Sequence, residues 1–235
     1  PSPKVFYEGI FDKKYITIME YSRGKVAYEL YKKASLNLRK NILKSAGVNL
    51  MKIHKLKMPK FWVHQHHEVK NQKQWMKWTK IRIEKYLKFF EKKLPKYLNY
   101  LKKDLDDFYL NLKNQKHMNF VPLHWDYHLS NINVDNKGQV IGIFDFDNCM
   151  KGHNLADIGQ TAYWIRFKVN DYKNFKYFLK GYGKKFTKAE LKLIRGYFLL
   201  HLLAVTRTIW YKQPRLTWII KEHKKILNEF VSGKF

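Results

Sequence analysis

Apolar residues recur at helical spacing along most of the chain, and this spacing predicts several long helices. The first covers about 26–56 and is followed by a loop over 58–71 with Pro59 near its start. Two more helices are expected at about 72–94 and 95–113. Further on, Thr187 and Glu190 have the spacing of a capping box, so a helix should begin there.

Strand patterns are short and few. The run 15–20 predicts a strand, with a turn at Ser22-Arg23-Gly24. A short strand is expected near Val121, and two more at 132–134 and 140–144. The turn between these last two ends in Gly138, which can adopt a positive φ. With everything after this hairpin expected to be helical, the predicted fold class is α+β, mostly helical, with one small β-hairpin.

The composition narrows the class of protein. In 235 residues, 45% are hydrophobic and 17% aromatic, which excludes a disordered chain. Cys149 is the sole cysteine, so an internal disulfide framework is excluded and a reducing, cytoplasmic compartment is expected. No apolar run approaches the roughly 20 residues of a membrane span, so no transmembrane segment is expected.

The charge is strongly positive but uneven. The formal net charge is +28, yet residues 121–160 hold five acidic and two basic side chains. The basic excess has two explanations: a compositional bias toward lysine, or a surface for nucleic acid or another anionic partner. Since only 7 of the 47 basic residues are arginine, the compositional explanation is favoured.

The acidic segment contains the residues that indicate chemistry. His124, Asp126 and Asn131 fit the pattern H-x-D-x-x-x-x-N of kinase catalytic loops, and an apolar strand ends in Asp145 fourteen residues later. In phosphoryl transfer a carboxylate accepts a hydrogen bond from the attacking hydroxyl, which suits Asp126. Magnesium needs hard oxygen ligands, which Asn131 and Asp145 would supply. His124 is expected to hold the loop by hydrogen bonds.

These motifs resemble those of the aminoglycoside phosphotransferase and choline kinase superfamily, over nearly the whole chain. The resemblance implies a protein-kinase-like C-terminal lobe, with 1–25 as the end of an N-terminal lobe and its hinge strand, and 26–235 as the helical catalytic and substrate lobe. It implies that Asp157, in Asp157-Ile158-Gly159, supports the catalytic loop. It also implies that the Glu20 carbonyl and the Ser22 amide meet the adenine of ATP.

The chain departs from the family pattern in two ways. Trp125 and Ser130 stand where glycine is usual, although no catalytic side chain is lost. No glycine-rich loop is found, and no strand lysine paired with a helix glutamate precedes the hinge. We therefore expect the nucleotide-clamping lobe to be missing upstream of Pro1, and the isolated chain to be weakly active or inactive.

Two hypotheses for the function follow. The first is an ATP- and Mg²⁺-dependent phosphotransferase acting on a hydroxyl of a small molecule. A protein kinase is disfavoured, because eleven residues between Asp145 and Asp157 leave no room for an activation segment. The second is a non-catalytic, degenerate kinase lobe whose basic helices bind nucleic acid, anionic lipid or an acidic protein. The acceptor and the oligomeric state stay undetermined.

The high positive charge argues against polycationic aminoglycosides as acceptors. Choline would require an aromatic cage, for which several aromatic residues are candidates, although most of them are expected in the core. They are Trp125, Tyr127, Tyr163, Trp164 and Trp210.

Three further features have simple explanations. The cluster His64 to Glu68 is expected to be a solvated loop rather than a metal site. The aromatic and basic helix at 72–94 is expected to pack on the lobe rather than lie on a membrane. Cys149 is expected to be a packed residue.

Overall fold

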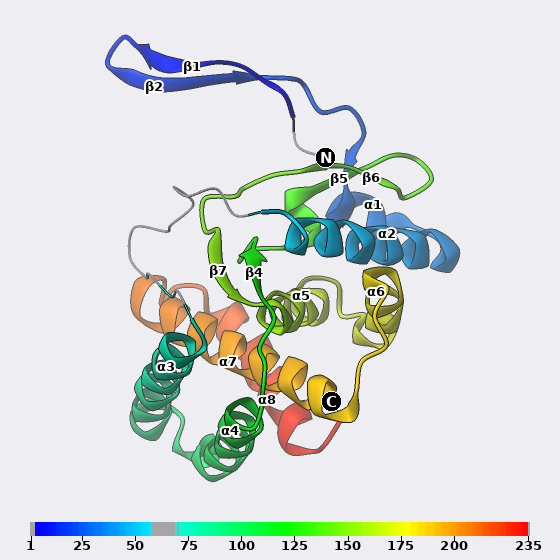
Figure 1. The fold of residues 1–235 in the computed structure, drawn as a ribbon. Helices are drawn as coiled ribbons and strands as arrows, with labels where there is room; N and C mark the ends of the chain where they lie inside the picture. The colour runs from blue at the N-terminus through cyan, green and yellow to red at the C-terminus, as the bar shows by residue number, and fades with distance from the viewer. Residues whose placement is uncertain (1–2, 58–68, 70, 235) are drawn as a thin grey trace.

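The computed structural model describes residues 3–57, 69 and 71–234. Figure 1 shows a mostly helical body with small antiparallel sheets toward one end. The helices are α1 (Ala27–Lys33), α2 (Leu36–His54), α3 (Gln72–Lys93), α4 (Leu98–Lys113), α5 (Asn154–Val169), α6 (Phe175–Tyr182), α7 (Lys188–Lys212) and α8 (Thr217–Val231). The predicted fold class, α+β and mostly helical, is confirmed.

The described strands form three separate sheets. They are β1 (Val5–Phe11), β2 (Lys14–Met19), β3 (Lys25–Val26), β4 (Phe120–Leu123), β5 (Ile132–Val134), β6 (Val140–Ile143) and β7 (Met150–His153). β1 pairs with β2, β5 lies between β3 and β6, and β4 pairs with β7, all antiparallel. The acidic segment, residues 121–160, contains β5, β6, β7 and all but the first residue of β4.

The helix predictions are largely confirmed, with one correction. The single helix expected at 26–56 is two helices, α1 and α2, because Ser35 caps a new helix: its hydroxyl accepts a hydrogen bond from the Leu38 amide. α3 and α4 follow the expected bounds and are separated at Pro95. The capping box of Thr187 and Glu190 is present at the start of α7.

The strand predictions are confirmed at β2, β4, β5 and β6, but they are incomplete. β1, β3 and β7 lie where no strand is predicted, and the expectation that the chain is helical beyond the β5–β6 hairpin is wrong at Met150–His153. β7 is stabilised by its pairing with β4, from Phe120 opposite His153 to Leu123 opposite Met150. Such a pairing joins segments that are distant in the sequence, so the local sequence pattern does not predict it.

The β5–β6 turn has the predicted geometry. Gly138 has φ +79°, and the Asp135 carboxylate accepts hydrogen bonds from the amides of Lys137 and Gln139. The hairpin is anchored to α2, where the Ser45 hydroxyl accepts from the Val140 amide at 2.9 Å. The short turn and this anchor hold β6 in place relative to α2. They therefore also position the residues that follow β6, among them Asp145.

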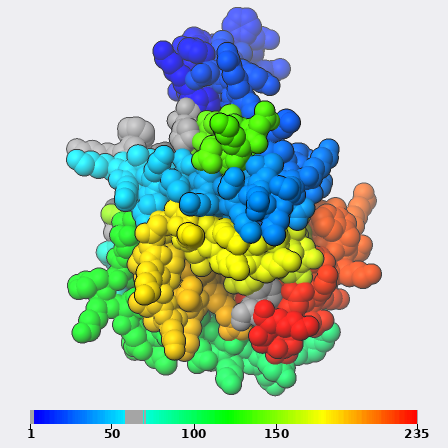
Figure 2. All heavy atoms as spheres, turned by 90° about the vertical axis from the view of Figure 1, so that its right-hand side faces the viewer, coloured from blue at the N-terminus to red at the C-terminus, as the bar shows by residue number. Residues whose placement is uncertain are grey.

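The β1–β2 hairpin stands away from the helical body. Figures 1 and 2 show it projecting beyond the rest of the molecule in both views. Its residues are almost all exposed, including Ile10 at 73% and Phe11 at 69%. It therefore contributes little to the main hydrophobic core.

The core lies around α5, most of whose residues from Asn154 to Arg166 are buried. α7 packs along α5, and α2 crosses α6 very closely. A Cβ at Gly181 would come within 1.9 Å of the Lys44 carbonyl oxygen, so this crossing requires glycine. In the described part of the chain, no helix combines the length and the apolar character that a membrane span needs.

The remaining predictions have mixed outcomes. The His64 to Glu68 cluster lies outside the described residues. The apolar face of α3 packs in the core, with Trp75 and Phe90 fully buried, so this helix belongs to the lobe as expected. Cys149 is buried, and burial raises the pKa of its thiol to about 12, which suits a packed residue.

Candidate active site

The H-x-D-x-x-x-x-N residues form a loop between β4 and β5 that ends in a short 3-10 turn, Leu129–Asn131. Asp126 is half-buried in this loop. The Asn131 Nδ2 donates to the Asp126 backbone carbonyl at 3.1 Å and to its carboxylate Oδ2 at 3.4 Å. Since the amide nitrogen of Asn131 faces Asp126, its Oδ1 is left to accept from another group.

The surroundings of Asp126 favour its protonated form. Burial raises the pKa of this carboxyl above its ordinary value, and the Asp145 carboxylate raises it further. The charges of His124 and Lys168 and the hydrogen bond from Asn131 act in the opposite direction. A carboxylate with a raised pKa is a stronger base than an exposed one.

Asp145 follows β6 and faces the same loop. The Phe144 amide donates to the Asn131 carbonyl at 2.9 Å, which joins the end of β6 to the end of the loop. Asp145 has φ +63°, in the left-handed region, and its side chain is exposed. The hairpin therefore brings Asp145 close enough to Asp126 for their charges to interact.

Asn131 and Asp145 offer the hard oxygen ligands that Mg²⁺ prefers. The Asn131 Oδ1 accepts no hydrogen bond from the described residues. In that part of the chain no three His, Cys, Asp or Glu side chains converge as a complete metal site. Two protein oxygens suit an ion that takes its other ligands from water and phosphate, so the residues present fit magnesium.

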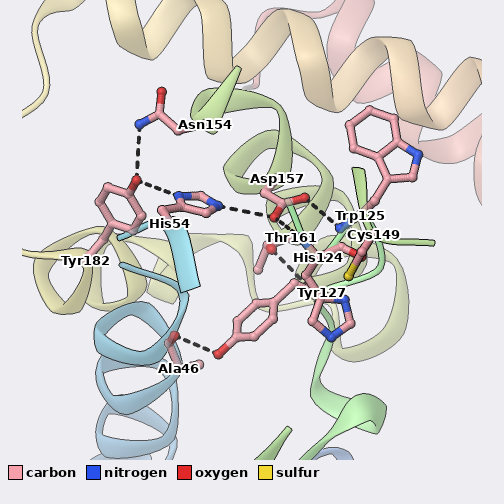
Figure 3. Close-up of polar contacts among 10 residues, drawn as sticks. All are labelled: Ala46, His54, His124, Trp125, Tyr127, Cys149, Asn154, Asp157, Thr161 and Tyr182. Carbon is pink, nitrogen blue, oxygen red and sulfur yellow. Dashed lines mark hydrogen bonds and ion pairs between the residues drawn. The ribbon is translucent and has the colours of Figure 1, made fainter. Parts of the chain in front are cut away.

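Asp157, in the first turn of α5, holds the backbone of the loop that contains Asp126 (Figure 3). Its Oδ2 accepts from the His124 amide at 2.8 Å, and its Oδ1 accepts from the Trp125 amide at 3.0 Å. The His54 Nε2 lies 3.2 Å from the same Oδ2, and its Nδ1 lies 2.7 Å from the Tyr182 hydroxyl. This fully buried carboxylate thus ties the loop to α2 and α6.

His124 links the loop to the end of β6. Its Nε2 lies 2.9 Å from the Phe144 carbonyl, a distance at which the ring nitrogen donates. The ring packs against Phe146, with the centroids 4.5 Å apart. These contacts lie beside Asp126 rather than on it, and a role of His124 in ordering the loop stays our prediction.

The predicted hinge residues lie in a small pocket of about 200 Å³. Glu20 and Ser22 line it together with Tyr21, Arg23 and Ile141, among others. The Ser22 hydroxyl accepts from Asn133 Nδ2 at 3.2 Å, which connects the hinge to β5. Ile141 lies on β6, and Asp145 lies two residues beyond the end of this strand, so β6 connects the pocket to Asp145. Adenine binding here stays a prediction.

Most of the chain matches one family of known proteins. The model of the phosphotransferase enzyme family matches residues 1–193 of the sequence. The chain belongs to this family. No curated protein matches it at a significant level.

Solved structures share the fold of this phosphotransferase-family chain. A thermostable mutant of aminoglycoside phosphotransferase APH(4)-Ia is 15% identical with a TM-score of 0.66, covering 97% of this chain and 78% of that one. A choline/ethanolamine kinase family protein from Mesorhizobium loti is 16% identical with a TM-score of 0.62, covering 87% of this chain. The match spans only 63% of the Mesorhizobium protein's own length. The aminoglycoside phosphotransferase APH(3'')-Id from Streptomyces rimosus, in complex with ADP and streptomycin, is 15% identical with a TM-score of 0.54, covering 85% and 75%.

The structure explains how the chain accommodates Trp125 where the family usually has glycine. Trp125 has φ +61°, a left-handed conformation that glycine adopts without strain. Its ring packs against Trp78 and Trp75, with centroid distances of 5.6 and 6.1 Å. The backbone thus keeps the shape expected of glycine, and the added ring contacts α3.

Several residues that support the loop are not among those predicted from the sequence. His54 on α2 could not be linked to Asp157 without the fold. The Thr161 hydroxyl donates to the Tyr127 carbonyl at 2.9 Å, and the Tyr127 hydroxyl donates to the Ala46 carbonyl at 2.9 Å (Figure 3). Thr161 lies four residues after Asp157, so the sequence spacing alone could have placed both residues on the same helix face.

Lys168 near the end of α5 was missed as well. Its Nζ donates to the hydroxyl of Ser130, in the loop that contains Asp126, at 3.0 Å. Its charge also acts on Asp126. Nothing in the sequence around Lys168 distinguishes it from the other lysines.

Proposed function

We propose that this chain is the catalytic part of an ATP- and Mg²⁺-dependent phosphotransferase that acts on a hydroxyl group of a small molecule. The observation that carries the proposal is the environment of Asp126. This residue is half-buried, accepts a hydrogen bond from Asn131 and is close enough to Asp145 for their charges to interact. Its loop is held by hydrogen bonds to Asp157. Such an arrangement offers a proton acceptor next to a pair of magnesium ligands.

The reaction assigns a role to each group. The acceptor oxygen forms a bond to the γ-phosphorus of ATP, the bond from that phosphorus to the bridging oxygen of the β-phosphate breaks, and ADP leaves. Asp126 orients the attacking hydroxyl and takes its proton. Asn131 and Asp145 would hold magnesium, which would supply positive charge to the phosphates. Glu20 and Ser22 would meet the adenine through their backbone atoms.

The comparisons support this proposal at a coarser level. The family is one of phosphotransferases, and the Streptomyces rimosus relative holds ADP and streptomycin. At identities of 15% to 18% among several of these structures, the likeness concerns the fold, so the acceptor is not carried over. The activity of this chain is likewise part of the proposal.

The test is ATP turnover with a panel of hydroxylated acceptors in a protein that includes a nucleotide-clamping lobe, since this chain has no glycine-rich loop and no paired strand lysine. Asp126→Asn should lower phosphate transfer by about 10²–10⁴-fold while nucleotide binding persists, because only the proton acceptor is lost. Asp145→Ala should weaken Mg²⁺-dependent nucleotide binding instead. Asp106→Asn, at an exposed position of α4, is the matched control and should change neither property. Full turnover in Asp126→Asn would refute the assignment.

A further inference from the structure

Two cations contact the loop that holds Asp126, and among the described residues neither forms a salt bridge, although the charge of Lys168 acts on Asp126. Lys168 donates to Ser130 in the catalytic loop, and its ammonium lies 4.9 Å from the Trp164 ring centroid. Arg82 on α3 lies 4.3 Å from the Trp78 ring centroid and 5.6 Å from that of Trp125. Both cations are half-buried, so their charges are less screened than those of surface lysines.

Contacts connect Arg82 to the Asp126 neighbourhood. Trp125, under the guanidinium, directly precedes Asp126. On the other side, His128 Nε2 lies 3.6 Å from Asp126 Oδ2, and the His128 ring contacts Trp164 at 5.0 Å. Burial and then the Arg82 charge lower the pKa of His201, and the charge of His128 acts on the same ring. A series of contacts therefore links Arg82, through Trp125 and the loop that holds Asp126, to Trp164 and Lys168.

The aromatic rings near Asp126 already contact cations of the protein or are buried. A cage for a quaternary ammonium group needs open aromatic faces. Here Arg82 lies over Trp78 and Trp125, and Lys168 lies over Trp164. Tyr127 is fully buried with its hydroxyl bonded to a backbone carbonyl. A cationic acceptor would have to displace the protein's own cations, so this environment disfavours one.

Trp164 and Arg82 have N–H groups that donate no hydrogen bond to the described residues. Among the described residues, the buried indole Nε1 of Trp164 has no partner. In the same part of the chain, Arg82 donates only through Nε, to the Tyr86 hydroxyl, so its two terminal nitrogens are left. A buried N–H without an acceptor is costly, and a guanidinium offers paired donors that match a carboxylate or phosphate.

We propose that the acceptor molecule carries an anionic group, a carboxylate or a phosphate, next to its reacting hydroxyl, and that Lys168 and Arg82 bind this group. The inference rests on the proposed function for the hydroxyl transfer, but the anion site itself can be tested by binding. It names a substrate class opposite in charge to aminoglycosides and choline.

The experiment compares three sugars with one ring and different charges: glucuronate, glucose and glucosamine. A second set of smaller probes is glycerate, glycerol and 3-aminopropane-1,2-diol. Binding to the full chain is measured by calorimetry and by tryptophan fluorescence at physiological ionic strength, and ADP release is measured in parallel with ATP and Mg²⁺. We expect the anionic member of at least one set to bind most tightly. A ranking in which charge makes no difference, or in which the cation binds best, overturns the inference.

Variants separate a specific site from the general positive charge. The double variant Arg82→Gln with Lys168→Gln should weaken binding of the anionic probe by about tenfold or more. The matched control, Lys102→Gln with Lys103→Gln on the exposed face of α4, removes the same charge and should leave binding unchanged. Equal losses in both variants refute a site at Arg82 and Lys168. If the anion binds as expected but no acceptor raises ADP release even with a nucleotide-clamping lobe supplied, the proposed transfer fails while the anion site stands.

Discussion

At the scale of single residues, Trp125 combines two opposing effects. Its left-handed backbone is strained for any residue with a Cβ, while its ring packs against α3. Trp125→Ala and Trp125→Gly both remove the ring, so the difference between them isolates the backbone. We expect the glycine variant to have a free energy of unfolding about 1 kcal/mol higher than the alanine variant, measured by urea denaturation.

The opposite order is expected at an ordinary helical position. Lys103 lies in α4 and is exposed, so Lys103→Gly should be about 1 kcal/mol less stable than Lys103→Ala. If Trp125→Ala proved as stable as Trp125→Gly, the left-handed conformation at this position would be wrong.

Asp157 is the residue on which the loop depends most. It is fully buried and is approached by two loop amides and the His54 imidazole. Asp157→Asn keeps the shape but places an NH₂ group against N–H donors. We expect a loss of about 2–4 kcal/mol in the free energy of unfolding, together with lower phosphate transfer.

Tyr182→Phe is the comparison for this variant. It removes a hydroxyl that contacts His54 and Asn154 but not Asp157, and should cost about 1 kcal/mol. A smaller loss in Asp157→Asn than in Tyr182→Phe would contradict the assignment of Asp157 as the main support of the loop.

At the scale of elements, the β5–β6 hairpin positions Asp145 through its tight turn and its contact with α2. A Cβ at Gly138 would lie 3.0 Å from Ile42 Cγ1 and 3.2 Å from the Ile42 nitrogen. Gly138→Ala therefore adds crowding to backbone strain, and we expect about 2 kcal/mol of destabilisation in urea unfolding.

Gly183 provides the control for the backbone effect alone. It has φ +77°, close to the +79° of Gly138, but a Cβ at this position would have its nearest neighbouring atom 3.7 Å away. Gly183→Ala should cost only about 1 kcal/mol. Equal costs at the two glycines would show that the contact between the turn and α2 is unimportant.

At the scale of the whole molecule, buried histidines make stability depend on pH. Burial lowers the pKa of His153 and His223 to about 4 and that of His201 to about 3. These rings stay neutral in the folded chain, whereas in the unfolded chain they gain a proton below about pH 6.5. The unfolded state then binds more protons, so stability is complete above pH 6.5 and falls as the pH drops toward 4.

Each of these histidines should remove about 1 kcal/mol per pH unit below 6.5, so the loss between pH 7.5 and 5.5 should be about 3 kcal/mol. Urea unfolding at the two pH values measures it. His153→Gln should reduce the loss, whereas His117→Gln, at an exposed position, should not. Unchanged stability at pH 5.5 would contradict the buried, neutral state of these rings.

The net charge is also a property of the whole molecule. Exposed lysines occur on most helices, among them α3, α4, α6, α7 and α8. This spread is typical of a composition rich in lysine, whereas Arg82 and Lys168 differ in being half-buried beside the catalytic loop. Binding of nucleic acid or an anionic surface by the basic helices stays a prediction.

Features that depend on neighbouring residues could be predicted from the sequence alone. The bounds of α3 and α4, the capping box before α7 and the turn at Gly138 follow from periodicity and local hydrogen bonding. The spacing of His124, Asp126 and Asn131 identified the loop, because a catalytic loop is a continuous segment.

The distant residues that meet at that loop could be identified only from the folded structure. His54 reaches Asp157 from more than a hundred positions away, and Lys168 reaches Ser130 from the far end of α5. β7 exists because β4 pairs with it, and Arg82 is directed to Trp125 by the packing of α3. Such contacts leave no periodic pattern, because their energy comes from segments brought together by folding of the whole chain.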